Sequence, residues 1–314
     1  MILTVTLNSA VDKTYTVEQF AIDRVHRPST WRIVAGGKGI NVARVYKALG
    51  GEAIATGFIG GSSGNFILEG VRSEGITSDF VRTEGESRIC IAILDPINKT
   101  QTELNEVGPQ ITPDEVERLK LKFESLIPGI QYAVLSGSIP PGVPDSIYRE
   151  LIEIARHHGV RCLLDTSGAA LVEGLKAIPF MAKPNVHELA AITGRQLATV
   201  EEAVEAAVEV NRSGIEVVAV TLGRDGAFVI TKEEAWKCRP PEISFVSAVG
   251  SGDAFASAFV YILENGGSVS DALRMGVGAG AANAMEFGAG FCKKEDIIKL
   301  AAQSEITRLD IPSR

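Results

Sequence analysis

The sequence predicts an α/β protein in which helices cover both faces of a mostly parallel sheet, with a small β-sheet lid inserted into this three-layer core. From about residue 110 onward, short β-branched runs alternate with amphipathic helical patterns, which predicts the parallel sheet. Two earlier segments, residues 14–34 and 88–104, instead alternate apolar and polar residues. Such alternation is typical of a sheet with one face in water, and it predicts the lid.

The first 110 residues divide between the two parts of the fold. Residues 2–7 and 53–59 are apolar runs that fit the core sheet, whereas the second lid segment is interrupted by a turn at residues 95–99. We therefore expect a single domain over residues 1–314. Its core comprises about residues 1–10, 38–86 and 109–314, and its lid comprises about residues 11–37 and 87–108.

Capping patterns in the sequence indicate where helices of the core begin. Thr112 and Glu115 form a capping-box pattern with Pro113 in the first turn, and a second box at Thr199 opens a helix that ends at Gly214. Ligands in such folds bind beyond the carboxyl ends of the parallel strands. The other elements that we expect are strands over residues 132–136, 160–165, 216–221 and 226–231, and a helix over residues 145–158.

Composition excludes several classes of protein. The chain has 314 residues, a net charge of −8 and scattered basic residues, which argues against nucleic acid or an anionic membrane as the main partner. Its four cysteines lie far apart and include no C-x-x-C pair, so a disulfide framework or a zinc site is not expected. No apolar stretch reaches the roughly 20 residues that span a bilayer, and the first residues resemble no leader peptide. We expect a cytoplasmic protein.

The most informative motif is residues 248–253 (AVGSGD), followed by an apolar helical run. Gly250 and Gly252 allow a tight turn, and the first N–H groups of the helix then lack internal partners, which makes the helix start an anion site. Asp253 could take the proton of an attacking hydroxyl there. The alternative is that Asp253 only caps the helix.

A second glycine-rich loop, residues 36–41 (GGKGIN), places Lys38 where a phosphate could bind, just before a helix that we expect to begin at Asn41. The loop is not a Walker A motif, because glycine rather than serine or threonine follows the lysine. The alternative is a simple turn between lid and core.

Residues 276–281 (GVGAGA) match a loose dinucleotide fingerprint. They lie inside a helical pattern with no strand before them, so the context that such a site requires is missing. We expect these small residues to pack one helix against its neighbours, which removes the main support for a dehydrogenase.

Weaker candidates lie at other strand ends. Asn185 and Glu188, three residues apart in a first helical turn, could hold the water shell of Mg²⁺ or could simply cap the helix. Asp12, soon after the first strand, could bind sugar hydroxyls. The segments 136–142 (SGSIPPG) and 221–226 (TLGRDG) could approach a ligand, although the second could be only a hairpin.

Taken together, these motifs resemble the ribokinase-like carbohydrate kinases, the PfkB family, over essentially the whole chain. Both family signatures are present, in residues 36–41 and 250–253. Within the family the chain is most similar to the branch of 1-phosphofructokinase and tagatose-6-phosphate kinase. That likeness rests on Lys38 and on residues 87–91 (SRICI), 102–106 (TELNE), 136–142 (SGSIPPG) and 183–185 (KPN).

The resemblance implies a role for each motif. Asp253 would be the base, and the amides of Gly250, Ser251, Gly252 and Asp253 would bind the transferring phosphoryl group. Asp12, Gly37 and Asn41 would hold the sugar, and Lys38, Arg88 and Ser138, with help from Arg27 on the lid, would surround its existing phosphate. The ATP site would include Lys183, Asn185, Thr221, Gly223 and Gly226, while Glu188 and, through water, Asn185 would organise Mg²⁺.

The function implied is ATP-dependent phosphorylation of a ketohexose phosphate to a bisphosphate, by a chain that pairs through its lids into a homodimer. The alternatives are a kinase for an unphosphorylated sugar or nucleoside, and a non-catalytic sugar-phosphate sensor. Two residues depart from the family pattern: Ser9 replaces a proline and Ser251 replaces an alanine. Ser9 bears on sugar preference, whereas Ser251 is small enough to preserve the anion site.

Overall fold

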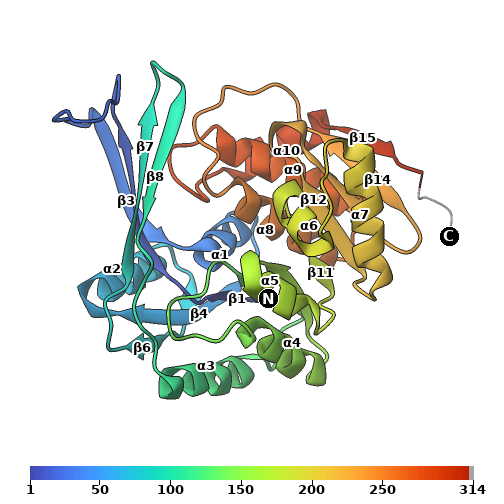
Figure 1. The fold of residues 1–314 in the computed structure, drawn as a ribbon, viewed down its shortest axis with the longest axis horizontal. Coiled ribbons are helices and arrows are strands. Elements are labelled where there is room, and N and C mark those ends of the chain that lie inside the picture. Colours follow the sequence, from blue (N-terminus) through green and yellow to red (C-terminus); the bar gives the residue numbers. More distant parts are fainter. Residues whose placement is uncertain (311–314) are drawn as a thin grey trace.

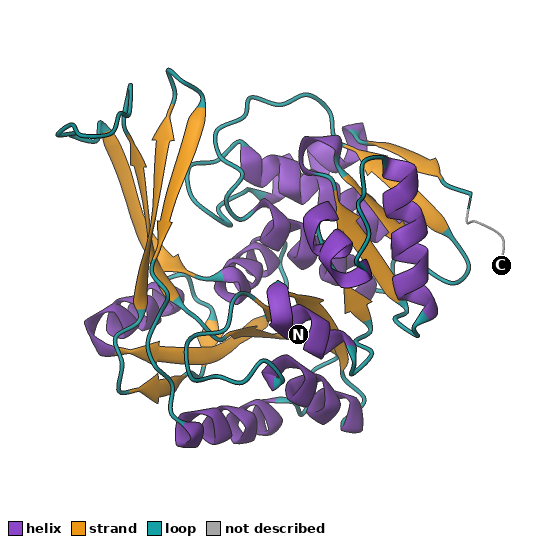
Figure 2. Cartoon of the chain, viewed as in Figure 1, coloured by secondary structure: helices purple, strands orange, loops and turns teal. Residues whose placement is uncertain are grey.

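The computed structural model describes residues 1–310, which form two sheets (Figures 1 and 2). The large sheet has eleven strands in the order β15-β14-β13-β12-β11-β10-β9-β1-β4-β5, with β6 paired to β4. These strands are β1 (Ile2–Thr6), β4 (Ala53–Gly60), β5 (Thr77–Ser78), β6 (Val81–Thr83), β9 (Tyr132–Ser136), β10 (Arg161–Asp165), β11 (Met181–Ala182), β12 (Val217–Thr221), β13 (Ala227–Ile230), β14 (Ala235–Arg239) and β15 (Glu305–Arg308).

In the order of the large sheet, neighbouring strands from β5 across to β12 pair parallel, and β6 is parallel to β4. Strands β13, β14 and β15 continue this sheet with antiparallel pairing. The mostly parallel core predicted from the sequence is therefore confirmed. The hairpin predicted at residues 221–226 is also present, because β12 and β13 pair antiparallel across it.

Helices cover both faces of the large sheet, and alternate strand residues point to separate apolar clusters, as in Ile2 and Leu3 of β1. One face carries α1 (Lys38–Ala48), α2 (Gly61–Ser73), α8 (Ser251–Glu264) and α9 (Val269–Ala284), with α10 (Lys294–Gln303) packed on α9. The other face carries α3 (Pro113–Leu126), α4 (Ile147–His157), α5 (Gly168–Leu175), α6 (Val186–Thr193) and α7 (Val200–Arg212).

Local signals in the sequence explain several helix boundaries. The capping boxes at Thr112 and Thr199 are both formed, since each threonine accepts a hydrogen bond from the N3 amide and the N3 glutamate bonds back. Helix α1 begins at Lys38, three residues before the start that we expected, because Gly37 with φ 112° turns the chain into the helix.

The small residues of the loose dinucleotide fingerprint pack helices together, as predicted. A Cβ on Gly276 would lie 2.9 Å from the Phe255 ring of α8, and one on Gly278 would lie 2.6 Å from the backbone of Ala301 on α10. These glycines therefore allow α9 to approach both neighbours closely.

The second sheet has four strands in the order β3-β2-β7-β8 and projects from the core (Figure 1). Its strands are β2 (Ala10–Thr16), β3 (Thr30–Gly36), β7 (Arg88–Asp95) and β8 (Thr100–Asn105). The central pair, β2 with β7, is parallel, and the two outer pairs are antiparallel. Asp12 lies within β2 rather than directly behind the first core strand.

Within residues 1–310, none of the helices combines the length and apolar character that crossing a membrane requires.

Candidate active site

A cavity of about 400 Å³ opens where the small sheet meets the core. Core elements contribute the start of α1, the start of α8 and the ends of β10 and β12, and the small sheet contributes residues of β2, β7 and β8. Most of the predicted site residues line it: Asp12, Gly37, Lys38, Asn41, Arg88, Lys183, Asn185, Glu188, Thr221, Gly250, Gly252 and Asp253.

The start of α8 has free amide donors that face this cavity. Gly250 is the N-cap in a left-handed conformation with φ 82°, and a Cβ there would lie 2.6 Å from the Cβ of Ala289, so only glycine fits. In residues 1–310, the amides of Gly252 and Asp253 donate to no other group. With the positive end of the helix dipole behind them, these amides suit a phosphoryl group.

A buried asparagine that sequence reasoning missed braces this loop. Asn283 of α9 donates from Nδ2 to the Val249 carbonyl at 2.8 Å and to the Ser251 hydroxyl at 3.2 Å, and its Oδ1 accepts from the Gly290 amide at 2.7 Å. Ser251, where the family has alanine, therefore gains a hydrogen bond to Asn283 while the helix start stays open to the cavity.

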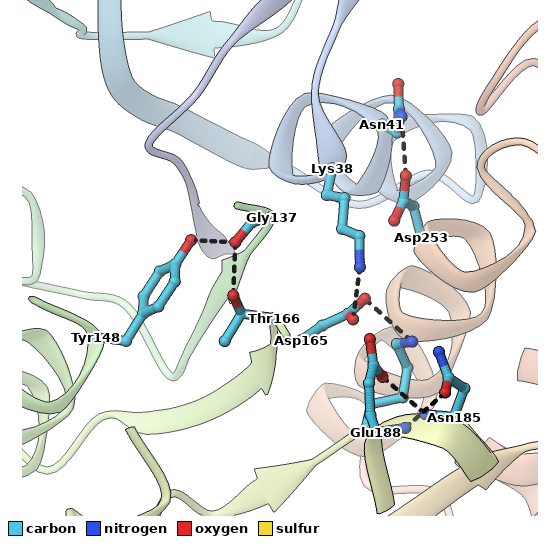
Figure 3. A network of polar contacts seen from close by, with 10 residues as sticks. Lys38, Asn41, Gly137, Tyr148, Asp165, Thr166, Asn185, Glu188 and Asp253 are labelled. Atoms are coloured by element: carbon cyan, nitrogen blue, oxygen red, sulfur yellow. Dashed lines mark hydrogen bonds and ion pairs between the residues drawn. The ribbon is translucent and has the colours of Figure 1, made fainter. Parts of the chain in front are cut away.

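Asp253 is buried at the floor of the cavity. Its Oδ2 accepts a hydrogen bond from Nδ2 of Asn41 at 2.9 Å (Figure 3). Burial raises the pKa of the Asp253 carboxyl, and the Asp165 carboxylate adds to the effect, against the opposing charges of Lys38 and Lys183. A carboxylate with a raised pKa at the start of a helix is suited to accept a proton from a hydroxyl.

Asp165, at the end of β10, is a site residue that the sequence analysis did not single out. Its Oδ1 accepts from Nζ of Lys38 at 2.9 Å, and its Oδ2 lies 3.1 Å from Nζ of Lys183 (Figure 3). Burial opposes ionisation of this carboxyl, but the two lysines outweigh it and lower its pKa. Burial likewise opposes the charge of Lys38, yet Asp165 and Asp253 outweigh it and raise the Lys38 pKa.

The small sheet adds a carboxylate and a cation to the opposite wall. Burial raises the pKa of Asp12 to about 6, although Arg44 and Arg88 oppose the shift. A Cβ on Gly36 would lie 2.0 Å from Oδ2 of Asp12, so this glycine makes room for the carboxylate. Arg88 donates from Nε to the Asn8 carbonyl at 3.2 Å and from Nη1 to the Glu106 carbonyl at 3.1 Å.

The predicted residue Ser138 is exposed, lies outside the cavity lining and accepts a hydrogen bond from Nδ2 of Asn8 at 3.3 Å. Asn8 thus links Ser138 to Arg88, two residues predicted to bind one phosphate. The predicted residues Gly223 and Gly226 lie in the turn behind Thr221, outside the cavity lining, and Arg27 is exposed in the loop between β2 and β3, also outside it.

Asn185 and Glu188 form a capping box at the start of α6. The Asn185 side chain accepts from the Glu188 amide at 2.9 Å, and Oε2 of Glu188 accepts from the Asn185 amide at 2.8 Å (Figure 3). The cap does not use Oε1 of Glu188, and both residues line the cavity. Residues 1–310 contain no cluster of three or more His, Cys, Asp or Glu side chains that could hold a metal. The pair therefore fits only an ion that keeps most of its water shell, as Mg²⁺ does.

Three features define the class of protein: open amides at a helix start, a buried carboxylate beside them, and cations around the cavity that they share. This is the constellation of a phosphotransferase acting on an alcohol. The model of the pfkB family of carbohydrate kinases matches residues 4–296. The chain belongs to that family and is an ATP-dependent sugar kinase, which confirms the family and the fold class predicted from the sequence.

Individual relatives agree with this assignment. The chain is 33% identical over 307 residues to a 1-phosphofructokinase of Borreliella burgdorferi, covering 98% of each chain. Among solved structures it is similar to phosphofructokinase-2 of Escherichia coli in complex with substrates and products, with a TM-score of 0.91, 30% identity and coverage of 96% and 98%. The structure of the same enzyme with fructose-6-phosphate gives a TM-score of 0.89 at the same identity and coverage.

Proposed function

We propose that this kinase transfers the γ-phosphoryl group of ATP to a ketohexose phosphate and forms a bisphosphate. Fructose 1-phosphate and tagatose 6-phosphate are the candidate acceptors. The observation that carries the proposal is the buried Asp253 carboxylate next to the open amides of Gly252 and Asp253, in a cavity that also contains Lys38 and Arg88. The 1-phosphofructokinase relative supports the choice of a phosphorylated acceptor.

In this proposal Asp253 accepts the proton of the acceptor hydroxyl as its oxygen attacks phosphorus. The amides at the start of α8 stabilise the negative charge on the migrating group, whose loose transition state makes such stabilisation the main source of rate. Asp12, Gly37 and Asn41 bind the sugar hydroxyls. Lys38, Arg88 and Ser138 bind the phosphate that the acceptor already carries, through charge-assisted hydrogen bonds.

For the nucleotide side we propose that Lys183, Asn185, Thr221, Gly223 and Gly226 contribute to the ATP site. Glu188, with Asn185 through water, would hold Mg²⁺, which would neutralise phosphate charge when bound. The small sheet would act as a lid that keeps water from competing with the acceptor. Arg27, in the loop between β2 and β3 of that sheet, would move toward the acceptor as the lid closes, which a ligand-bound structure tests directly.

A coupled assay of ATP consumption tests the function. It compares kcat/KM for fructose 1-phosphate, tagatose 6-phosphate, fructose 6-phosphate and unphosphorylated fructose. We expect a phosphorylated ketose to exceed fructose by about 100-fold or more, since two charge-assisted contacts would be lost with the phosphate. Equal values for fructose, or a preference for a nucleoside, would favour the alternative kinase. Binding of the sugar phosphate without ATP turnover would identify a sensor.

We also propose that two copies pair through their lids. Trp31 and Ile33 of β3 and Leu104 of β8 are exposed apolar side chains on this small sheet, with exposed fractions of 63%, 41% and 57%. Pairing would remove them from water. Light scattering of the wild type and of the Trp31→Lys variant tests the proposal, which predicts a dimer that the variant weakens and a wild-type monomer as the contradicting result.

A further inference from the structure

Arg44 of α1 is buried beneath the active site, and all five of its N–H donors are used. Nε and Nη2 bind the two carboxylate oxygens of Glu74 at 2.7 and 3.0 Å, and Nη2 also donates to the Ala35 carbonyl at 2.6 Å. Nη1 donates to the Ala289 carbonyl at 2.9 Å and to Oδ1 of Asn41 at 2.8 Å. The planar fork is therefore fixed on every side.

The contact with Asn41 has a chemical consequence. A guanidinium group only donates hydrogen bonds, so the Asn41 atom that faces Arg44 must be the carbonyl oxygen. The NH₂ group of the same amide then points the other way, where it donates to Oδ2 of Asp253 at 2.9 Å. The orientation of the amide next to the base is thus set from behind, by a residue outside the cavity lining.

We propose that Arg44 is a positioning residue for phosphoryl transfer, which fixes the Asn41 amide with its NH₂ group toward the Asp253 carboxylate. This inference rests on the proposed function, in which Asp253 accepts the proton. If the Asn41 amide were turned by 180°, its oxygen would face the Asp253 carboxylate. The two oxygens would repel each other when Asp253 is ionised, and the carboxylate would move away from the position in which it accepts the proton.

The charges around Asp253 make this hydrogen bond important. Asp12 of β2 and Asp165 of β10 are acidic neighbours, and Lys38 of α1 and Lys183 are the basic ones. Burial already raises the pKa of Asp253, and the Asn41 hydrogen bond is one of the contributions that lower it. Replacing that donor by an acceptor therefore moves the pKa further up.

The test compares the Arg44→Met variant with Arg149→Met, which removes an arginine of α4 from a half-exposed ion pair with Glu173 of α5. The kcat/KM of each is measured against pH, in the wild-type and in the Asp12→Asn background, because the charge of Arg44 also lowers the pKa of Asp12. For Arg44→Met we expect the acidic limb of the profile to move up by about one pH unit. At neutral pH we expect kcat to fall by roughly 10- to 100-fold. Arg149→Met should match the wild type. An acidic limb that stays in place in Arg44→Met, with only a lower melting temperature, overturns the proposal.

A double-mutant cycle tests whether Arg44 acts through Asn41. In the Asn41→Ala background, Arg44→Met should lower kcat by less than about threefold, because the amide that it orients is gone. If the two substitutions instead lower kcat independently, so that their fold-changes multiply, Arg44 acts elsewhere, for example through Ala289. If Arg44→Met does not fold, Arg44→Lys decides: it keeps the charge but not the fork, so a smaller upward shift supports the proposal and a wild-type profile contradicts it. Failure of the proposed function is distinct, since it would appear as absent turnover in the wild type or as full activity in Asp253→Asn.

Discussion

The two walls of the active-site cavity differ in how firmly their polar groups are held. On the core wall, Asp253 and Asn41 are buried with hydrogen-bond partners within the core, and the buried Asn283 braces the neighbouring loop from behind. On the wall formed by the small sheet, Glu103 and Asn105 of β8 are exposed and bond mainly to each other or to Gln101. Fixed groups suit the chemical step, which depends on geometry, whereas exposed ones can adapt to an acceptor.

The strongest test of this contrast is Asp253→Asn on the core wall. Asparagine keeps the size of the side chain but cannot take the proton, so kcat should fall by about 10²- to 10⁴-fold while ATP binding stays near the wild-type value. Steady-state kinetics and nucleotide titration measure both quantities, with Asp114→Asn in the exposed first turn of α3 as the control. Near-normal turnover in Asp253→Asn would remove this residue from the role of base.

On the opposite wall, Arg88→Ala should act on binding rather than on chemistry. We expect the KM for a sugar phosphate to rise by about 10- to 100-fold, with a much smaller change for an unphosphorylated sugar, because a charge-assisted contact to the phosphate is lost. Arg82→Ala on β6 is the matched control. Should both KM values rise equally, Arg88 does not hold the acceptor by its phosphate.

Asp12→Asn sharpens the comparison through pH. Because burial raises the pKa of Asp12 to about 6, the folded wild type binds more protons than the unfolded chain between about pH 4 and pH 6. Its stability therefore declines as pH rises through that window. Asp12→Asn lacks this decline, so we expect it to melt a few degrees above the wild type at pH 7 but not at pH 4. Its KM for the sugar should rise by about tenfold. Melting curves at the two pH values and steady-state kinetics check this, and a lower melting temperature at pH 7 would contradict it.

The smallest effect on catalysis is expected away from both walls, at Gly278→Ala. The added methyl group would press on Ala301, and such overpacking costs about 1–3 kcal/mol of stability. Denaturant unfolding should show this loss, while kcat and KM at moderate temperature stay unchanged. A changed KM for ATP would mean that the glycine-rich helix contributes to ligand binding after all.

Local patterns predicted much of the fold. The capping boxes, the buried strands and the segments of the small sheet could be predicted because each is encoded within a few residues. The antiparallel strands β14 and β15 were not predicted, since their pairing joins residues 235–239 with residues 305–308 across the segment that holds α8, α9 and α10. Such pairing depends on the finished core rather than on local preference.

The candidate site shows the same division. Glycine-rich loops carry a recognisable signature, so Gly250, Lys38 and Asp253 could be singled out from the sequence. Asp165, Asn283 and Arg44 could not, because an isolated polar residue in a strand or helix is equally typical of a surface position. Their importance comes from burial against partners that are distant in the sequence, such as Lys38 for Asp165 and Gly290 for Asn283.

The parallel pairing of β2 with β7 in the middle of the small sheet affects how the protein is made. Between these strands the chain forms α1, β4 and α2 of the core, so a ribosome that has finished β3 has made only a two-stranded hairpin of the small sheet. A lone hairpin is marginally stable in water, and β2 of this hairpin lacks its parallel neighbour β7 until β7 and β8 have been made, at Asn105. The nascent chain therefore carries an incomplete sheet with exposed apolar side chains while about a fifth of its length is synthesised, and early chaperone contact should fall on this hairpin.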